Sequence, residues 1–433
     1  MADRPIDVAV VGAGAAGLFA AIFAGRAAPP DARVVAFDGA RRLGAKILIA
    51  GGGRCNVTHD VVHPEDYAGG PAATRNAVKK VLRSFTVADT VEFFRGHGVE
   101  LKREDTGKLF PTTDRARTVL DALLRAADDA GAELRTGHRI ETVTESAGGG
   151  FEIATSRGDF AARRVILCTG GLALPKTGSD GHGYRLARAL GHTVTDTWPA
   201  LVPLRLPDGH WLTTLKGIAV DVTLTLAEPG GKVRRRQSGA MLLTHFGVSG
   251  PAAMDLSRHF AGHFDRDVSF RLTANLAPDH TAESLDAEVL RQVETQPTRT
   301  LLQFVKARFP ERLADALLRH GTGVDPATPL SQLRKDDRRS LIRTLTALPL
   351  PVVADRGYEH AEVTAGGVPL SEVDLRTMAS RRCDGLHLAG EILDVDGRIG
   401  GYNFQWAWCT GRLAGRAAGG VLPRTAQEKA RVG

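Results

Sequence analysis

The sequence predicts an α/β fold in which a Rossmann-like nucleotide-binding domain, formed from both ends of the chain, is interrupted by a β-rich domain that carries a helical subdomain. Two observations lead to this prediction. Residues 8–38 run from an apolar strand through a glycine-rich turn and a small-residue helix to a second apolar strand. From about residue 192 short β-like segments appear, then Arg- and Leu-rich helical periodicity, and the β pattern returns near residue 360.

The turn within residues 8–38 has the G-x-G-x-x-G pattern of dinucleotide-binding βαβ units. Gly12 permits the tight turn, Gly14 lets the backbone approach a pyrophosphate, and Gly17 lets helix and strand pack closely. An acid about 20 residues further on can accept hydrogen bonds from a ribose diol. The helix start offers unpaired N–H groups and a positive dipole end to phosphates. The predicted dinucleotide contacts are Gly12, Gly14, Ala15, Ala16, Gly17 and Asp38.

Composition and charge are those of a globular chain long enough for two or three domains, with 433 residues and a formal net charge of +7. The densest basic run, 232–236, follows a Pro-Gly-Gly turn as in a solvated hairpin arm, so we disfavour a nucleic-acid partner. Residues 8–25 carry no charge. The leader Met-Ala-Asp-Arg nevertheless has no net positive charge, and Ala and Gly dominate the run, which argues against a signal peptide or membrane span.

Four cysteines are too few for a disulfide scaffold in a chain of this length, and the lack of a C-x-x-C pair argues against a disulfide reductase. A cytoplasmic protein is therefore the default expectation. No metal-ligand spacing is evident. Helical periodicity covers 72–97, 114–130, 181–190 and about 403–418. From the changes in pattern we expect a discontinuous nucleotide-binding domain (1–191 and 360–433), a β-rich inserted domain (192–281 and 350–359) and a helical insert (282–349).

Four further segments carry specific motifs. Residues 44–58 contain G-G-G-R-C-N, 169–181 begin with T-G-G, 243–251 read L-T-H-F-G-V-S-G-P, and 389–407 contain G-E-I-L-D-V-D-G-R-I-G-G-Y-N-F-Q. Together they resemble the bacterial BaiN/YhiN-like flavoproteins, which are NAD(P)/FAD-dependent oxidoreductases with a glutathione-reductase-like fold. Members of that family have been described as aminoacetone oxidases or bile-acid 3-dehydro-Δ4,6-reductases. The resemblance covers nearly the whole chain, although residues 282–349 match only in their general composition and pattern and not in specific motifs.

The resemblance implies bound FAD, and the residues of 44–58 suit that cofactor. Gly51–Gly53 can expose consecutive N–H groups as an anion nest, and Lys46 and Arg54 add positive charge. The alternative for these glycines is a flexible turn. Cys55 has no acid–base partner nearby in sequence, which favours a packing role over a nucleophilic one. The contacts implied here are Lys46, Gly53, Arg54, Cys55 and Asn56.

The remaining implied contacts lie further along the chain. Ile140 stands where such folds touch adenine, and the second strand-to-dinucleotide turn supplies Thr169 and Gly170. Gly390 and Glu391 replace the Gly-Asp whose acid binds the ribityl chain, and the sequence does not choose between Glu391, Asp394 and Asp396 for that role. The last helix opens with Gly400, Gly401, Tyr402 and Asn403.

The N-terminus of this last helix would stabilise the negative charge of reduced flavin at its pyrimidine edge. The alternative is a glycine-rich N-cap with no ligand contact. Trp406 and Trp408 are expected to pack the helix rather than stack on the cofactor. His245 is expected to be structural, although His245 or Ser249 could face a substrate.

We therefore expect an FAD-dependent oxidoreductase that acts on a small organic substrate, with no catalytic residue assigned. The direction stays open between NAD(P)H-driven reduction of a conjugated enone and oxidation of an amine. Because only one full dinucleotide fingerprint is present, NAD(P)H as a donor would visit the flavin transiently. An RNA-binding or RNA-modifying flavoprotein, suggested by the basic net charge, and a non-enzymatic flavin-binding redox sensor are the alternatives.

Overall fold

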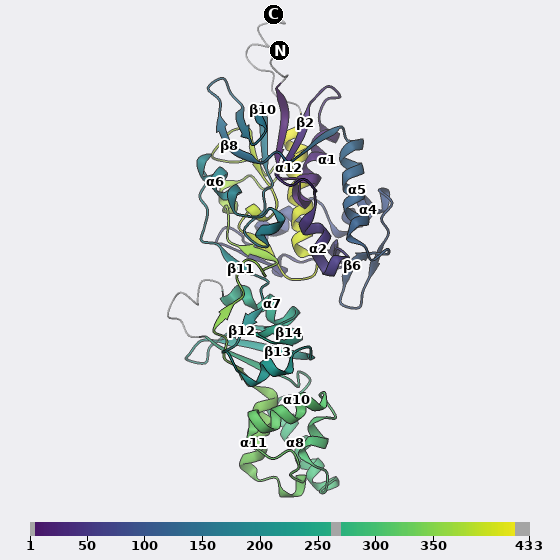
Figure 1. Cartoon of the computed structure of the whole chain (residues 1–433), viewed down its shortest axis with the longest axis vertical. Coiled ribbons are helices and arrows are strands. Elements are labelled where there is room, and N and C mark those ends of the chain that lie inside the picture. Colours follow the sequence, from purple (N-terminus) through teal and green to yellow (C-terminus); the bar gives the residue numbers. More distant parts are fainter. Residues whose placement is uncertain (1–4, 261–269, 421–433) are drawn as a thin grey trace, which may run out of the picture. The chain divides into compact units, whose positions relative to one another are not determined.

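The structure, a computed structural model, describes residues 5–260 and 270–420. It divides into two compact units, which we call unit 1 (Met1–Trp198 with Val363–Gly433) and unit 2 (Pro199–Glu362). Figure 1 shows the two units in the colours of the sequence. The leader at residues 1–4 lies outside the described residues. The strands β11 (Trp198–Ala200) and β19 (Val363–Ala365) lie where the chain passes from one unit to the other.

Unit 1 is built on a seven-stranded sheet with a parallel centre. In the order β7-β2-β1-β10-β9-β8, its strands are Ala132–Thr136, Val34–Asp38, Ile6–Val11, Gly158–Leu167, Phe151–Thr155 and Ile140–Glu145, and β20 (Leu386–Leu388) also pairs with β10. β1 lies parallel to both β2 and β10, and all six of its residues are buried. A strand covered on both faces in this way needs a nearly continuous apolar run, as the sequence has here.

Seven helices and two small sheets complete the described part of unit 1. The helices are α1 (Ala15–Ala27), α2 (Ala45–Gly53), α3 (Arg75–Leu82), α4 (Val87–Gly96), α5 (Ala116–Asp129), α6 (His182–Ala189) and α12 (Tyr402–Gly419). One small sheet pairs β4 (Tyr67–Gly69) with β21 (Val395–Gly397), and the other joins β3 (Thr58–His59), β6 (Lys108–Pro111) and β5 (Leu101–Arg103).

The two ends of unit 1 meet where α12 lies beside α1 (Figure 1). Gly411, Gly415 and Gly419 recur every four residues on one face of α12. A Cβ atom at these positions would lie 2.2–2.5 Å from carbonyl oxygens of α1. Glycine is therefore required for this close approach, and the spacing G-x-x-x-G-x-x-x-G is a signal that the sequence analysis did not use.

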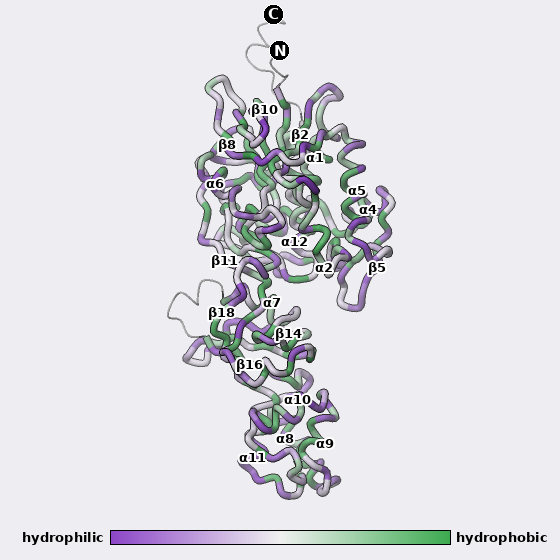
Figure 2. The backbone as a smooth tube through the Cα atoms, in the orientation of Figure 1, coloured by the Kyte–Doolittle hydropathy of each residue, from purple (hydrophilic) through white to green (hydrophobic). Residues whose placement is uncertain are grey.

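Unit 2 combines an antiparallel sheet with a group of helices. In the order β17-β16-β13-β14-β15-β12-β18, the strands are Leu348–Leu350, Arg271–Asn275, Ala219–Ala227, Val233–Thr244, Gly247–Ser249, Leu204–Arg205 and Ala354–Asp355. The helices are α7 (Pro251–Ser257), α8 (Ala282–Thr295), α9 (Leu301–Val305), α10 (Glu311–Ala316) and α11 (Lys335–Thr346). Figure 2 shows hydrophobic residues recurring between hydrophilic ones along α8 and α11.

The structure keeps α8–α11 and this sheet in one compact unit, so the finer domain boundaries stay a prediction. One predicted helical segment differs from the structure. The helical periodicity of 72–97 is divided between α3 and α4. The break occurs because Thr86 caps α4: its hydroxyl accepts from the Asp89 N–H at 3.2 Å, and the Asp89 carboxylate accepts from the Thr86 N–H at 2.7 Å.

Candidate functional site

The glycine-rich turn between β1 and α1 has the geometry that its motif predicts. Gly12 adopts φ +93°, and a Cβ at Gly17 would lie 1.8 Å from the Gly12 carbonyl oxygen. A Cβ at Gly14, in contrast, would meet no atom of the described residues within 4 Å, apart from its own neighbours along the chain. Two of the glycines are therefore demanded by the protein's own packing, whereas Gly14 and the start of α1 border open space.

The acid at the end of β2 holds the backbone around this turn. Asp38 accepts a hydrogen bond from the Ala13 N–H at 2.9 Å through Oδ2 and from the Ala40 N–H at 2.8 Å through Oδ1. Each carboxylate oxygen has a second lone pair, so Asp38 keeps the capacity to accept hydrogen bonds from a ribose. Ala15 and Ala16 begin α1 directly above the turn.

The G-G-G segment at the end of α2 forms a left-handed stretch. Gly51, Gly52 and Gly53 have φ values of 56°, 69° and 85°, and all three are exposed. The neighbouring cations have partners of their own. Lys46 Nζ lies 2.9 Å from Glu391 Oε2, which joins two motifs from opposite ends of the chain. Arg54 Nη1 lies 2.6 Å from a carboxylate oxygen of Glu104.

The two residues after Arg54 are buried. Cys55 is fully buried, and burial raises the pKa of its thiol to about 12. A neutral thiol is a poor nucleophile, so its surroundings suit packing better than covalent chemistry. Asn56 is 7% exposed, and its Oδ1 atom has no hydrogen-bond partner within the described residues.

The second turn, after β10, lies beside a cavity of about 290 Å³. The buried Thr169 hydroxyl, like Asn56 Oδ1, finds no partner among residues 5–260 and 270–420. Gly170 follows with φ +71°. Ile140 is buried, and its carbonyl oxygen lies 2.9 Å from Nε2 of His182. The cavity is lined by Arg139, Leu172, Asp180, Gly181, His182, Tyr184, Arg185, Arg188, Val194 and Thr197.

The three carboxylates of the C-terminal motif have different surroundings. Glu391 accepts from Lys46 and, at 3.0 Å, from the Thr364 N–H. Asp394 Oδ2 accepts from the Thr195 hydroxyl at 3.2 Å, and Asp396 is buried on β21. Gly390 precedes them with φ +80° and donates its N–H to the Thr410 hydroxyl. These contacts do not choose among the three carboxylates for a ribityl chain.

The start of α12 is set by its glycines and by the side chain of Asn403. A Cβ at Gly401 would lie 2.5 Å from the Thr58 carbonyl carbon, so the helix start fits closely against β3. Gly400 has φ +120°. Asn403 accepts from the Gly397 N–H at 2.8 Å and donates to the Gly397 carbonyl at 3.0 Å, which uses its amide within the chain. Tyr402 stacks on His59, with ring centroids 4.9 Å apart.

Comparison with known proteins assigns the family. The HI0933-like protein Rossmann domain matches residues 6–417. A 3-dehydro-bile acid delta(4,6)-reductase from Clostridium scindens is 36% identical over 412 residues, which cover 95% of this chain and 98% of that protein. The chain belongs to the HI0933-like family. The resemblance inferred from the motifs and the Rossmann-like α/β fold are thereby confirmed.

Other similar proteins carry different names. A ribosomal RNA dihydrouridine synthase from Escherichia coli is 34% identical over 405 residues, with 93% of this chain and 95% of that protein covered. A crystal structure of a 3-ketosteroid-delta4-(5alpha)-dehydrogenase from Rhodococcus jostii RHA1 aligns with a TM-score of 0.49 at 17% identity, covering 97% of this chain and 98% of that one.

In this HI0933-like protein the cavity residues Arg139, Asp180 and His182 were missed by sequence reasoning. Arg139 and Asp180 form an ion pair at 2.7 Å, and His182 meets the predicted adenine strand through Ile140. The available signal was the Gly-Ser-Asp-Gly-His-Gly run at 178–183, which continues directly from the T-G-G motif. Asp180 and His182 of this run contact Arg139 and Ile140, at the start of the strand that the resemblance associates with adenine.

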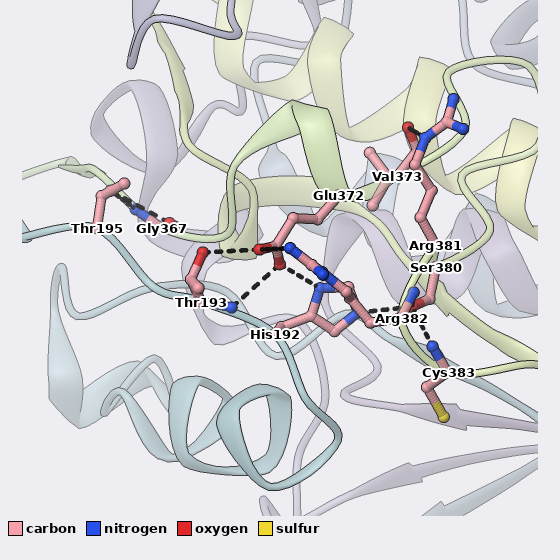
Figure 3. Close-up of polar contacts among 10 residues, drawn as sticks. All are labelled: His192, Thr193, Thr195, Gly367, Glu372, Val373, Ser380, Arg381, Arg382 and Cys383. Carbon is pink, nitrogen blue, oxygen red and sulfur yellow. Dashed lines mark hydrogen bonds and ion pairs between the residues drawn. The ribbon is translucent and has the colours of Figure 1, made fainter.

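A second polar cluster in unit 1 has the hydrogen-bond pattern of a hydrolytic triad (Figure 3). His192 lies 2.8 Å from Glu372 Oε2 through Nδ1 and 2.8 Å from the Ser380 hydroxyl through Nε2. The Ser380 oxygen also accepts from the N–H groups of Arg382 and Cys383, each at 2.9 Å. Both of its lone pairs are thus engaged. The cluster therefore holds His192 against the segment 372–383, and we interpret its role as stabilising the fold.

Two residues of the 243–251 motif lie in unit 2. The His245 ring meets the Phe246 ring edge-on, with centroids 5.0 Å apart, and the Ser249 hydroxyl lies 3.7 Å from the Met254 sulfur. Over residues 5–260 and 270–420, no group of three or more His, Cys, Asp or Glu could hold a metal ion. No helix among these residues is long and apolar enough to span a membrane.

Proposed function

We propose that this HI0933-like protein is an FAD-dependent oxidoreductase that reduces a carbon–carbon double bond conjugated to a carbonyl. The observation that carries the cofactor assignment is the state of its buried polar atoms. Asn56 Oδ1 and Thr169 Oγ1 are buried without partners within the described chain, and both belong to motifs that the resemblance assigns to FAD. Buried polar atoms in folded proteins are nearly always hydrogen-bonded, so these two atoms support the proposal that a ligand binds beside them.

The cradle around the first turn supports the same assignment. The open space at Gly14 would admit a diphosphate, and the N-terminus of α1 would stabilise its charge. Asp38 would accept from the ribose, and the three left-handed glycines 51–53 would present N–H groups as an anion nest. Lys46 and Arg54 are each paired with a glutamate, Glu391 and Glu104, so pairing favours neither cation as the source of positive charge near the cofactor.

The bound flavin would supply hydride exchange, and the chain's own groups would position the reactants and stabilise charge. The N-terminus of α12 would stabilise negative charge at the pyrimidine edge. The Lys46–Glu391 ion pair would hold the loop after β20 against α2. Reduction of a conjugated double bond adds a hydride to the β-carbon and a proton to the α-carbon, and the residue that delivers this proton is not assigned.

The names of two relatives support reduction over amine oxidation. A delta(4,6)-reductase of a 3-dehydro bile acid and a dihydrouridine synthase both, by the chemistry of their names, saturate a carbon–carbon double bond conjugated to a carbonyl. A small enone is therefore the first substrate class to test, with NAD(P)H as the transient donor.

The test is an anaerobic visible spectrum of the full-length protein reconstituted with FAD, recorded before and after NADPH and then NADH. We expect an oxidised-flavin spectrum that bleaches with one donor and returns when a conjugated enone is added. Bleaching by an amine instead, with peroxide formed in air, would replace the reductase by an oxidase. A flavin that no donor or substrate reduces would favour a redox sensor. No flavin spectrum at all would overturn the cofactor assignment.

An RNA substrate is the second candidate, because two relatives are named ribosomal RNA dihydrouridine synthase. β14 also carries three exposed arginines directly after its first residue, Arg234–Arg236, which could contact phosphates. Uridine-containing RNA should then reoxidise the reduced flavin, and its binding should weaken steeply with salt. Arg236→Glu should lower RNA affinity, whereas Arg319→Glu, at an arginine paired with Asp315 elsewhere in unit 2, serves as the control. No RNA binding at low salt would exclude this candidate.

A further inference from the structure

The last helix of unit 1 carries two buried tryptophans that differ in one respect. Trp406 is 2% exposed and Trp408 is fully buried. The indole N–H of Trp408 donates to the Val57 carbonyl oxygen at 2.9 Å. The indole nitrogen of Trp406 is also buried, but no atom of the described residues accepts from it. An indole N–H can only donate, and buried donors are nearly always paired, so an acceptor from outside this part of the chain would complete its hydrogen bonding.

The directions of the α12 side chains place Trp406 on a particular face. On one face, Gly411, Gly415 and Gly419 contact α1. Gln405 Nε2 donates to the Phe85 carbonyl oxygen at 2.8 Å, and Cys409 lies against the same oxygen, so a second face meets the segment between α3 and α4. Tyr402, Trp406 and Thr410 are spaced by four residues and therefore share a third face.

This third face contacts Gly390 of the C-terminal motif and Tyr67 of β4. The Thr410 hydroxyl accepts from the Gly390 N–H at 3.0 Å. The Tyr67 hydroxyl donates to the Tyr402 carbonyl at 2.8 Å, and the Tyr67 ring lies 6.0 Å from the Trp406 ring. Tyr67 belongs to β4, whose partner strand β21 carries Asp396. Trp406 thus shares a helix face with Thr410, which contacts Gly390, and its ring lies near Tyr67, whose strand pairs with the strand that carries Asp396. Gly390 and Asp396 are both among the predicted cofactor contacts.

We propose that Trp406 is a further cofactor-binding residue, whose indole N–H donates a hydrogen bond to an oxygen or nitrogen acceptor in the flavin–ribityl part of FAD. This inference rests on the proposed function. It adds a polar contact at the edge of the indole and requires no stacking of Trp406 on the flavin. It also explains why two tryptophans two residues apart on one helix have different hydrogen bonds: one N–H serves the fold and the other serves the ligand.

The test compares Trp406→Phe with the matched control Trp408→Phe, since each replaces an indole by a smaller aromatic ring. FAD dissociation constants would be measured by titrating full-length apoprotein, and apoprotein stability by urea unfolding. We expect Trp406→Phe to bind FAD about tenfold more weakly, and to lose less apoprotein stability than the control, because the indole N–H of Trp406 has no hydrogen-bond partner within residues 5–260 and 270–420. Trp408→Phe should lose apoprotein stability and keep parental FAD affinity.

A measurement on the parent protein keeps the proposal testable if a variant does not fold. The chain has four tryptophans, so ¹⁵N-indole labelling gives four N–H resonances. Whichever of the two phenylalanine variants folds will lack one of these resonances, which assigns that resonance to the replaced tryptophan. FAD should shift the Trp406 resonance and slow its hydrogen exchange, while the Trp408 resonance changes little. Parental FAD affinity in Trp406→Phe, or an unchanged Trp406 resonance, would overturn the proposal and leave a buried water as the partner. Failure of the parent to bind FAD would instead overturn the proposed function.

Discussion

The two units of this protein differ in how their buried polar atoms are satisfied. In unit 1, Asn56, Thr169 and Trp406 each bury a polar atom that finds no acceptor or donor among the described residues. In unit 2, the buried Ser257 hydroxyl donates to Met254, and the buried Thr344 hydroxyl donates to Gly321. Unit 2 is thus satisfied at these positions by its own chain, whereas the three positions in unit 1 are those where we propose that a ligand binds. The same kind of substitution should therefore have different consequences in the two units.

The largest expected effect separates two glycines of one turn in unit 1. Gly17→Ala places a methyl group 1.8 Å from the Gly12 carbonyl oxygen, and should cost about 3 kcal/mol or more of unfolding free energy or prevent folding. The methyl group of Gly14→Ala meets no atom of the described residues within 4 Å beyond its chain neighbours, and this variant should change stability by less than about 0.5 kcal/mol. Urea unfolding of the two apoproteins tests this difference.

The same pair tests the ligand. Gly14→Ala should still weaken FAD binding by about tenfold or more, because the added methyl group would occupy the space through which a diphosphate approaches the backbone. The measurement is a titration of the folded apoprotein with FAD. Parental affinity in Gly14→Ala would show that the diphosphate does not lie at this turn, and would remove the main contrast between the units.

In unit 2 we expect a large effect on stability alone. Leu285 on α8 is fully buried, and Leu285→Ala should lower the free energy of unfolding by about 2–5 kcal/mol through the lost burial and the cavity left behind. Leu290→Ala, on the same helix but 38% exposed, is the control and should change it by less than about 0.5 kcal/mol. FAD affinity should be parental in both variants, and a loss of affinity in Leu290→Ala would contradict the separation of roles.

The smallest effect is a pH dependence shared by both units. Burial lowers the pKa of His387 in unit 1 and of His259 in unit 2 to about 4. A histidine with a folded-state pKa below its unfolded value of about 6.5 takes up its proton more readily in the unfolded chain, so its stabilisation is present above pH 6.5 and is lost as the pH falls toward 4. For the buried His387 this loss amounts to about 3 kcal/mol at most.

Urea unfolding between pH 7 and pH 4.5 measures this loss. The variant His387→Gln should flatten the dependence, since its side chain cannot be protonated in this range. The exposed His360→Gln should leave the pH dependence as in the parent. Equal slopes for the parent and His387→Gln would mean that another group is responsible.

Much of the fold followed from local sequence patterns. The βαβ unit is present as β1, α1 and β2, and the last helix was expected at about 403–418 and runs over Tyr402–Gly419. These elements were predictable because their signals, apolar runs and periodic small residues, act over neighbouring positions. The boundary between α3 and α4 was missed, because one capping threonine at 86 outweighs a continuous apolar face.

The sequence by itself determined which segments carry the dinucleotide motifs and that the chain belongs with the BaiN/YhiN-like proteins. Only the tertiary structure decided what each side chain does there. Arg54 pairs with Glu104, Lys46 pairs with Glu391 across 345 positions, and the indole N–H of Trp406 finds no acceptor in the described part of the chain. The physical reason is that a side chain's hydrogen-bond partners and burial depend on residues brought together from distant parts of the chain, which local spacing does not encode.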